Sequence, residues 1–334
     1  MALTERISGF VARTFPTSWK VRISKYSIGH RFPVFVIAEV GINHNGSLEI
    51  AKQLIDASAE SGCQAVKFQK RTVPVVYTEE ELAKPRAVDR AVLETAIKRR
   101  VLSPEAVDRL QKSNFVDSTN GDLKWALEFT EEEYKDLFAY ANEKGLVAFA
   151  SPWDLESVDV LERLNVPCYK IASASITYIQ LLEKIKATGK PTVISTGMST
   201  MGQVLTAMNI FGEREIIVLH TVSTYPAADE DLNLAVIKTL QDTFPRVPIG
   251  YSGHEKGILP TLSAVALGAS VVERHITLDK TMFGTDQSAS LEPAELTELV
   301  QGIRQWESAK GTGIKSILPA EVPIMEKLRG TNKT

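Results

Sequence analysis

The feature that most constrains the fold is an alternation of short apolar runs with helix-like segments. The runs are rich in Val and Ile, as expected for parallel strands that are buried on both faces. Eight such runs occupy 34–38, 65–69, 147–150, 168–172, 192–196, 216–220, 247–250 and 271–275. The helix-like segments follow them at 47–62, 131–143, 155–164, 179–188, 201–211, 233–244, 258–267 and 293–307. Eight strands, each followed by a helix, predict an α/β fold of the (β/α)8 TIM-barrel type.

One spacing breaks this pattern, because about 80 residues separate the second and third runs. Residues 71–130 therefore form a predicted long loop insertion after strand 2. A charged helix over 79–100 is expected there, as a solvated lid or a subunit contact. A doubly wound sheet is the competing fold, but the turn at 41–46 matches its GxGxxG pattern poorly.

The two ends of the chain divide it into three predicted parts. Residues 1–33 are expected to form a basic N-terminal arm and a β-hairpin that runs through 21–23 and returns at 34–36. An organellar transit peptide is the alternative for this basic stretch. Residues 34–310 form the catalytic barrel, and residues 311–334 form a C-terminal linker or cap.

Composition excludes some classes of partner. The chain carries 38 Lys and Arg against 41 Asp and Glu, which leaves a formal charge of -3. This balance predicts neither nucleic acid nor a membrane as a partner. No apolar run approaches the ~20 residues that cross a bilayer. Two cysteines are too few for a disulfide scaffold, so a cytoplasmic location is expected.

Polar side chains gather where the predicted strands end, which is the catalytic face of such a barrel. Four of the five histidines fall in this ring: His44, His220, His254 and His275. Lys67 and Lys170 stand within apolar runs, where an unpaired charge is costly. The two lysines predict an anion-binding cradle completed by small hydroxyls. Those hydroxyls are Ser151, Ser173, Ser195 and Ser252.

A metal site is the second prediction for this face. His254 and His275 follow adjacent strands, and two such imidazoles suit a divalent transition metal with open positions. Glu39 and Asp286 could add a metal ligand, bind sugar hydroxyls or move protons. His220 could equally belong to the core. The set as a whole describes an anionic substrate beside a metal-polarised carbonyl.

Several motifs resemble those of the sialic acid synthase family, the phosphoenolpyruvate-dependent nonulosonate synthases. The match runs in order from about residue 21 to about residue 330. The motifs are FVIAEVGINHNG at 35–46, AVKFQ at 65–69, YKIAS at 169–173, ISTGM at 194–198, YP at 225–226, GYSGH at 250–254 and ERH at 273–275.

The resemblance implies a reaction and roles for individual residues. This family condenses phosphoenolpyruvate with the aldehyde of an N-acyl hexosamine or related aldose and releases phosphate. His254 and His275 match its metal ligands, with Mn²⁺ expected and Mg²⁺ or Co²⁺ also open. Glu39, Lys67 and Lys170 are the expected catalytic residues. The expected substrate-binding residues are Asn43, Gln69, Ser151, Ser173, Ser195, Ser223, Tyr225, Ser252 and Asp286.

Two departures from the family pattern bear on acceptor specificity. The family usually carries a C-terminal antifreeze-like domain, which in a homodimer lends an arginine to the partner's acceptor site. The present sequence stops at the corresponding linker, so that contact would have to come from elsewhere. The position of Ser223 often carries Asn in the family, which suggests a different hexose derivative.

Two other functions stay open from the residues alone. A Schiff-base sugar aldolase would use Lys67 or Lys170 and would need no metal. A non-catalytic sugar-binding barrel would keep the pocket without turnover. The intact set of lysines, serines and histidines favours the synthase.

Overall fold

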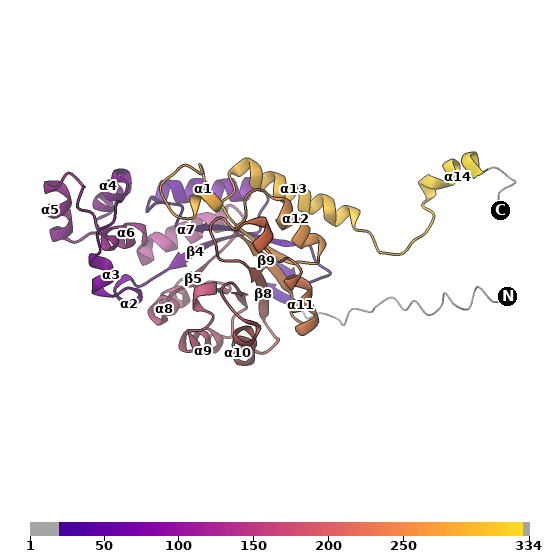
Figure 1. Cartoon of the computed structure of the whole chain (residues 1–334), viewed down its shortest axis with the longest axis horizontal. Coiled ribbons are helices and arrows are strands. Elements are labelled where there is room, and N and C mark those ends of the chain that lie inside the picture. Colours follow the sequence, from indigo (N-terminus) through magenta and orange to yellow (C-terminus); the bar gives the residue numbers. More distant parts are fainter. Residues whose placement is uncertain (1–19, 330–334) are drawn as a thin grey trace.

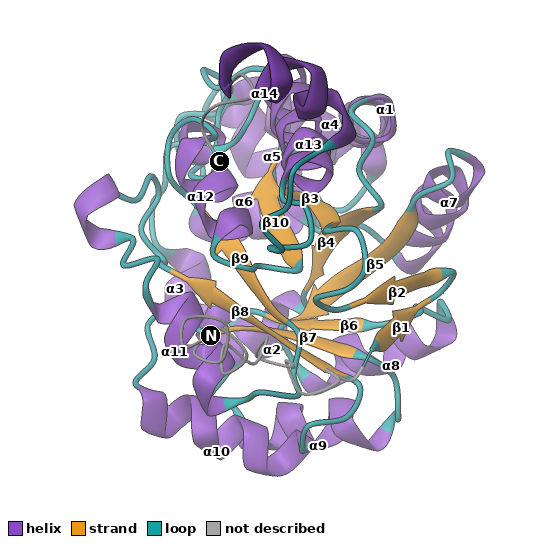
Figure 2. Ribbon diagram, turned by 90° about the vertical axis from the view of Figure 1, so that its right-hand side faces the viewer, coloured by secondary structure: helices purple, strands orange, loops and turns teal. Residues whose placement is uncertain are grey.

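The computed structural model describes residues 20–329 and confirms the (β/α)8 barrel. Eight parallel strands are paired in the order β5-β4-β3-β10-β9-β8-β7-β6, and β5 and β6, at the two ends, lie in contact and close the barrel. Figure 2 shows this ring of strands with helices around it. The strands are β3 (Phe35–Gly41), β4 (Ala65–Lys70), β5 (Val147–Pro152), β6 (Tyr169–Ile171), β7 (Thr192–Ser195), β8 (Ile216–Thr221), β9 (Ile249–Gly253) and β10 (Val271–His275).

The outer helices begin and end where local signals place them. The Ser47 side chain accepts from the backbone of Ile50 and caps α1, and Thr130 forms a capping box with Glu133 at the start of α7. Leu54 and Ile55 of α1 are fully buried against the barrel. The outer helices are α1 (Leu48–Glu60), α7 (Glu131–Glu143), α8 (Leu155–Arg163), α9 (Ile179–Ala187), α10 (Met201–Phe211), α11 (Val236–Thr243), α12 (Leu259–Ala266) and α13 (Pro293–Ala309).

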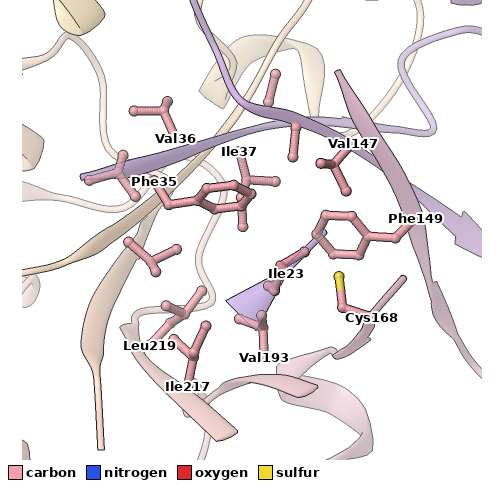
Figure 3. Close-up of a cluster of buried hydrophobic side chains, with 14 of the residues drawn as sticks. Ile23, Phe35, Val36, Ile37, Val147, Phe149, Cys168, Val193, Ile217 and Leu219 are labelled. Carbon is pink, nitrogen blue, oxygen red and sulfur yellow. The ribbon is translucent and has the colours of Figure 1, made fainter. Parts of the chain in front are cut away.

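A small hairpin precedes the barrel and seals one end of it. β1 (Val21–Ile23) pairs antiparallel with β2 (Tyr26–Ile28). The predicted return strand at 34–36 was therefore wrong, because Ser24 takes a positive φ in a tight turn and the chain returns immediately. In Figure 3, Ile23 lies among side chains of the barrel interior, including Phe35, Phe149 and Leu219. The hairpin therefore plugs the end of the barrel opposite the polar rim.

The insertion between β4 and β5 is helical rather than a plain loop. The predicted helix over 79–100 is two helices, because Pro85 disfavours a helical conformation at Lys84, which is extended. Val92, Ala96, Leu123 and Ala126 give the insertion a small core of its own. Figure 1 shows it standing at one end of the molecule. Its helices are α2 (Val73–Val76), α3 (Glu79–Ala83), α4 (Arg90–Arg99), α5 (Pro104–Lys112) and α6 (Asn120–Leu127).

The last described segment leaves the barrel after α13. An extended stretch leads to α14 (Val322–Arg329), which stands clear of the barrel in Figure 1. Within residues 20–329, no helix combines the length and the apolar character that crossing a bilayer requires. Short 3-10 helices occupy Ser173–Ser175, Asp229–Asp231, Gln287–Ala289 and Pro319–Glu321.

Candidate active site

An open pocket of about 690 Å³ lies at the carboxyl ends of the barrel strands. Every strand of the barrel contributes to its wall, directly or through the turn that follows it. Most of the residues predicted for the site line this pocket. These are Glu39, Lys67, Gln69, Ser151, Lys170, Ser173, Ser195, Ser223, Tyr225, Ser252, His254 and His275.

Four buried charges form the floor of the pocket. Lys67 Nζ lies 3.0 Å from Glu39 Oε2 and 3.3 Å from Glu273 Oε1. Lys170 Nζ lies 2.9 Å from the same oxygen of Glu273. Each of the four side chains is at most 4% exposed. Two lysines and two carboxylates therefore neutralise one another, which is what makes their burial tolerable.

The shared environment shifts the four pKa values in different directions. Burial raises the pKa of Glu39 to about 7, with nearby Lys67 opposing the shift. Burial also lowers the pKa of Lys170 to about 8, against the attraction of Glu273. For Lys67, the two carboxylates outweigh burial and raise the pKa. For Glu273, the two lysines outweigh burial and hold the pKa low. Glu273 therefore stays ionised, whereas Glu39 and Lys170 can change protonation near neutrality.

The serines around these charges fall into two groups. Ser151 accepts from Lys67, and Ser252 donates to Glu273, so both hydroxyls support the charges. Ser173 accepts from the backbone amide of Gly197. The hydroxyls of Ser195 and Ser223 are buried without a partner among the described residues. Buried hydroxyls without partners are costly, so these two are available to a ligand.

His254 and His275 lie together at one side of the pocket, with ring centroids 5.4 Å apart. His254 Nδ1 lies 2.6 Å from the carbonyl of Val222, which leaves Nε2 unprotonated when Nδ1 is the donor. His275 Nδ1 is buried without a hydrogen-bond partner among the described residues. Burial lowers the pKa of His254 to about 3 and that of His275 to about 4. Both imidazoles are therefore neutral near pH 7, as metal ligation requires.

The donor set around the two rings fits an open metal site and not a closed one. Among residues 20–329, no three His, Cys, Asp or Glu side chains converge closely enough to hold a metal ion. The two imidazoles would thus share the ion with oxygens from water or substrate. Tyr225 packs on His254 with a centroid separation of 4.1 Å and forms the wall on that side.

Two of the predicted residues stand outside the pocket wall. Asp286 Oδ2 lies 3.8 Å from His275 Nδ1, at the pocket's edge. The amide of Asn43 donates to the carbonyl of Ile276 and to Ser290, each at 2.8 Å. Asn43 therefore braces the segment that leaves β10, and its role as a substrate contact stays a prediction.

The other two histidines of the ring do not join the pocket. His44 accepts from the amide of Gly46 and stacks on Phe129 with centroids 4.2 Å apart. His220 Nε2 contacts the carbonyl of Leu232 at 2.7 Å and lines a neighbouring cavity. His44 follows β3 and His220 lies near the end of β8, yet both side chains are held by packing and backbone contacts.

Sequence reasoning did not assign a role to Glu273, which joins both lysines. The signal was present, because Glu273 stands inside an apolar run in the same way as Lys67 and Lys170. An acidic side chain in such a run needs a buried partner of opposite charge, and Lys67 and Lys170 were both candidates. Trp153 also lines the pocket, and the Arg71 guanidinium lies 4.2 Å from the centre of its ring.

Comparison with known proteins found a matching family model and several similar sequences. The model of the NeuB family matches residues 81–315. N-acetylneuraminate-9-phosphate synthase of Mus musculus is 40% identical over 303 residues, which cover 90% of this chain and 78% of the mouse protein. N,N'-diacetyllegionaminic acid synthase of Campylobacter jejuni is 36% identical over 291 residues, covering 86% and 80% of the two chains.

A solved structure agrees with these sequence matches. It is an N-acetylneuraminic acid (sialic acid) synthetase from Leptospira borgpetersenii in complex with citrate. The two chains superpose with a TM-score of 0.75 at 32% identity. The match covers 95% of this chain and 99% of the other.

Proposed function

Because this chain belongs to the NeuB family, we propose that it condenses phosphoenolpyruvate with the aldehyde of an N-acyl hexosamine. The products would be a nonulosonic acid and inorganic phosphate. The observation that carries this proposal is one pocket that holds two buried lysines beside two neutral histidines. An anionic enol ester and a carbonyl partner need those two kinds of group side by side.

Lys67 and Lys170 are proposed to hold the phosphate and carboxylate of phosphoenolpyruvate. In the absence of this anion, Glu39 and Glu273 neutralise both ammonium groups. Burial raises the pKa of Glu39 to about 7, so its carboxylate can take up a proton near neutrality. The ion pair between Glu39 and Lys67 would then be lost, which leaves the Lys67 ammonium group for the ligand. The free hydroxyls of Ser195 and Ser223 supply further donors for the ligand.

The carbonyl side of the reaction is proposed to lie between Glu39, Tyr225 and the two histidines. A divalent metal held by His254 and His275 would supply Lewis acidity toward the aldehyde oxygen. Glu39 positions the aldehyde and accepts or donates a proton during carbon–carbon bond formation. Gln69 holds Glu39 in place through a 3.0 Å hydrogen bond. The methylene carbon of phosphoenolpyruvate attacks the aldehyde, water adds to C2, and the C–O bond to phosphate breaks.

The names of the relatives leave the acceptor open. The mouse protein is named for a product with a phosphate, and the Campylobacter protein for a product without one. The acceptor is therefore proposed here only as an N-acyl hexosamine. A homodimer and a cytoplasmic location also remain proposals.

Phosphate release tests the proposed function. Purified protein is incubated with phosphoenolpyruvate and a panel of N-acyl hexosamines, with Mn²⁺ in one series and a chelator in the other. Release that needs both an acceptor and the metal supports the proposal. Release without any acceptor would indicate a phosphatase instead. If no acceptor gives phosphate release and phosphoenolpyruvate does not bind, the proposed function is contradicted.

A Schiff-base aldolase is the second candidate, and one observation favours it. The pKa of Lys170 falls to about 8 through burial, so a neutral amine is accessible. Such an enzyme would use pyruvate, work with chelator present and be inactivated by borohydride together with substrate. Equal turnover with and without metal would favour this reading.

A further inference from the structure

Arg71 lies directly after β4, at the start of the insertion, and the function proposed above gives it no role. Its side chain contacts two residues of the pocket wall, Gln69 and Trp153, but it is not itself one of the lining residues. Any influence of Arg71 on the reaction would therefore pass through one of these two neighbours.

Two hydrogen bonds connect Arg71 to the residue proposed for proton transfer. Arg71 Nη2 donates to Gln69 Oε1, and Gln69 Nε2 donates to Glu39 Oε1 at 3.0 Å. A guanidinium only donates hydrogen bonds, and a carboxylate only accepts them. The amide between them has one satisfactory orientation, with its oxygen toward Arg71 and its nitrogen toward Glu39. Without Arg71, nothing in this pair of bonds would keep the amide oxygen away from the carboxylate.

The contact between Gln69 and Glu39 lies in a narrow space beside Gly41. Gly41 has a φ of +54°, and a Cβ there would lie 3.2 Å from both Gln69 Nε2 and Glu39 Oε1. The other oxygen of the Glu39 carboxylate, Oε2, lies 3.0 Å from Lys67 Nζ. The placement of this carboxylate therefore depends on Gln69 at one oxygen and on Lys67 at the other.

The backbone around Arg71 is fixed by side chains of the insertion and the barrel. Glu128 accepts from the amide of Arg71 at 3.3 Å, and Lys70 Nζ donates to the carbonyl of Arg71 at 2.8 Å. The hydroxyl of Tyr134 donates to the carbonyl of Gln69. Arg71 and Gln69 thus leave β4 from a backbone that is held on both sides of Lys70.

The guanidinium of Arg71 is held by two aromatic residues. Its centre lies 4.2 Å from the centre of the Trp153 ring, and it is hydrogen-bonded to the hydroxyl of Tyr77. A planar guanidinium stacked on a ring loses little further freedom when it forms a hydrogen bond. Arg71 is therefore a rigid donor for the oxygen of Gln69.

We propose that Arg71 is a positioning residue for carbon–carbon bond formation: it orients the amide of Gln69, which in turn holds the carboxylate of Glu39 toward the aldehyde. This inference rests on the proposed function, since it assumes that the aldehyde lies near Glu39. The insertion then contributes to the reaction by fixing Arg71, through Glu128 and Tyr77, without touching the substrate.

Steady-state kinetics of Arg71→Met give the first test, in the phosphate-release assay with Mn²⁺ and an accepted N-acyl hexosamine. We expect kcat to fall roughly 10-fold, as for a reacting group that has lost its fixed placement. KM for phosphoenolpyruvate should stay the same, because this anion is assigned to Lys67 and Lys170. Arg71→Lys keeps a charged donor and should restore part of kcat. Arg90→Met removes an exposed arginine of the same insertion and should leave kcat unchanged.

A double-mutant cycle tests whether Arg71 acts through Gln69. Gln69→Leu removes both hydrogen bonds, so adding Arg71→Met to it should lower kcat no further. If Arg71→Met does not fold, the cycle uses Arg71→Lys, whose smaller loss should likewise vanish in the Gln69→Leu background. An equal loss in both backgrounds would overturn the proposal, because Arg71 would then act by another route. A normal kcat for Arg71→Met would overturn it as well.

The side-chain amide of Gln69 gives a readout that needs no turnover. In protein labelled with ¹⁵N at glutamine, its NMR signal is identified by its absence from Gln69→Leu. The amide protons should exchange with water faster in Arg71→Met than in the wild type, and unchanged exchange would overturn the positioning role. If the wild type accepts no sugar, the proposed function fails, and this exchange rate still decides whether Arg71 orients Gln69.

Discussion

At the residue scale, the pocket depends on four buried charges that come from four different strands. Lys67 from β4 and Lys170 from β6 share one oxygen of Glu273 from β10. Removing one charge therefore changes the protonation and the placement of the other three.

Glu39→Gln should keep the fold and lose most turnover. Glutamine keeps the volume and can still accept from Gln69, but it cannot take or give a proton near neutrality. We expect kcat to fall by ~10²-fold or more, as for loss of a general acid or base. Phosphate release measures the loss, and thermal unfolding is the control. Near-normal turnover in a folded variant would remove Glu39 from this role.

Affinity for phosphoenolpyruvate should weaken as the pH rises through about 8. The pKa of Lys170 is lowered to about that value by burial, so its ammonium is charged below pH 8 and neutral above it. A charged lysine binds the anion, and hence KM for phosphoenolpyruvate should increase on the alkaline side. Lys170→Met should show a high KM that no longer changes between pH 7 and 9. A flat wild-type profile over that range would contradict the assignment.

Much of the site could be predicted at this scale, for a physical reason. Lysines and histidines at strand ends stand out against apolar runs, and parallel strands bring their carboxyl ends to one face. The partners of these side chains could not be predicted in the same way. The sharing of Glu273 by two lysines depends on strand register and barrel closure, and the donation of Asn43 to Ile276 depends on the path of a loop.

At the scale of elements, the insertion is fitted to the barrel through a close backbone approach. Gly46, after β3, has a φ of +71°, and a Cβ there would lie 2.1 Å from the carbonyl oxygen of Ala126 in α6. Only glycine allows this contact. The insertion is therefore held against the loop that follows β3.

Gly46→Ala should destabilise the protein more than a matched glycine replacement. Gly145 also has a positive φ, of +82°, but a Cβ there would meet nothing within 4 Å. Gly145→Ala should cost ~1 kcal/mol from the backbone alone. Gly46→Ala should cost about 1–3 kcal/mol more, because the carbonyl of Ala126 must move. Urea unfolding compares the two, and equal losses would contradict the tight contact.

A buried ion pair next to the two pocket histidines ties β9 to β10. Arg274, between Glu273 and His275, is fully buried and pairs with Glu255, next to His254, at 2.9 Å. Arg274 also donates to Thr261 and to the carbonyl of Gly257 in the segment that leads to α12. The network holds the two histidine-bearing strands to one another.

Arg274→Met should lower the free energy of unfolding by about 3–5 kcal/mol, since it leaves the Glu255 carboxylate buried without its partner. The exposed pair of Arg90 and Glu94 supplies the control, because Arg90→Met should cost under ~0.5 kcal/mol. Denaturant unfolding of both variants is the measurement. Equal, small losses would mean that the buried pair is not stabilising β9 and β10.

At the scale of the whole molecule, the order of elements was the easiest property to predict. Strands buried on both faces produce apolar runs, and the spacing of those runs exposes the βα repeat. The hairpin was harder to predict, because the residues 34–36 fit a hairpin strand as well as a barrel strand. The insertion was also harder to predict, because Pro85 divides the segment 79–100 into two helices where the charge pattern predicts one.

The central claim is that the pocket joins phosphoenolpyruvate to an aldose with cleavage of the C–O bond to phosphate. The most direct test uses phosphoenolpyruvate that carries a heavy oxygen label between C2 and phosphorus. The protein is incubated with this substrate, Mn²⁺ and an N-acetylhexosamine or its 6-phosphate, and both products are weighed by mass spectrometry. We predict that the label appears in inorganic phosphate and that the sugar gains three carbons. Label retained in a keto acid, or no sugar of increased mass, would contradict the account.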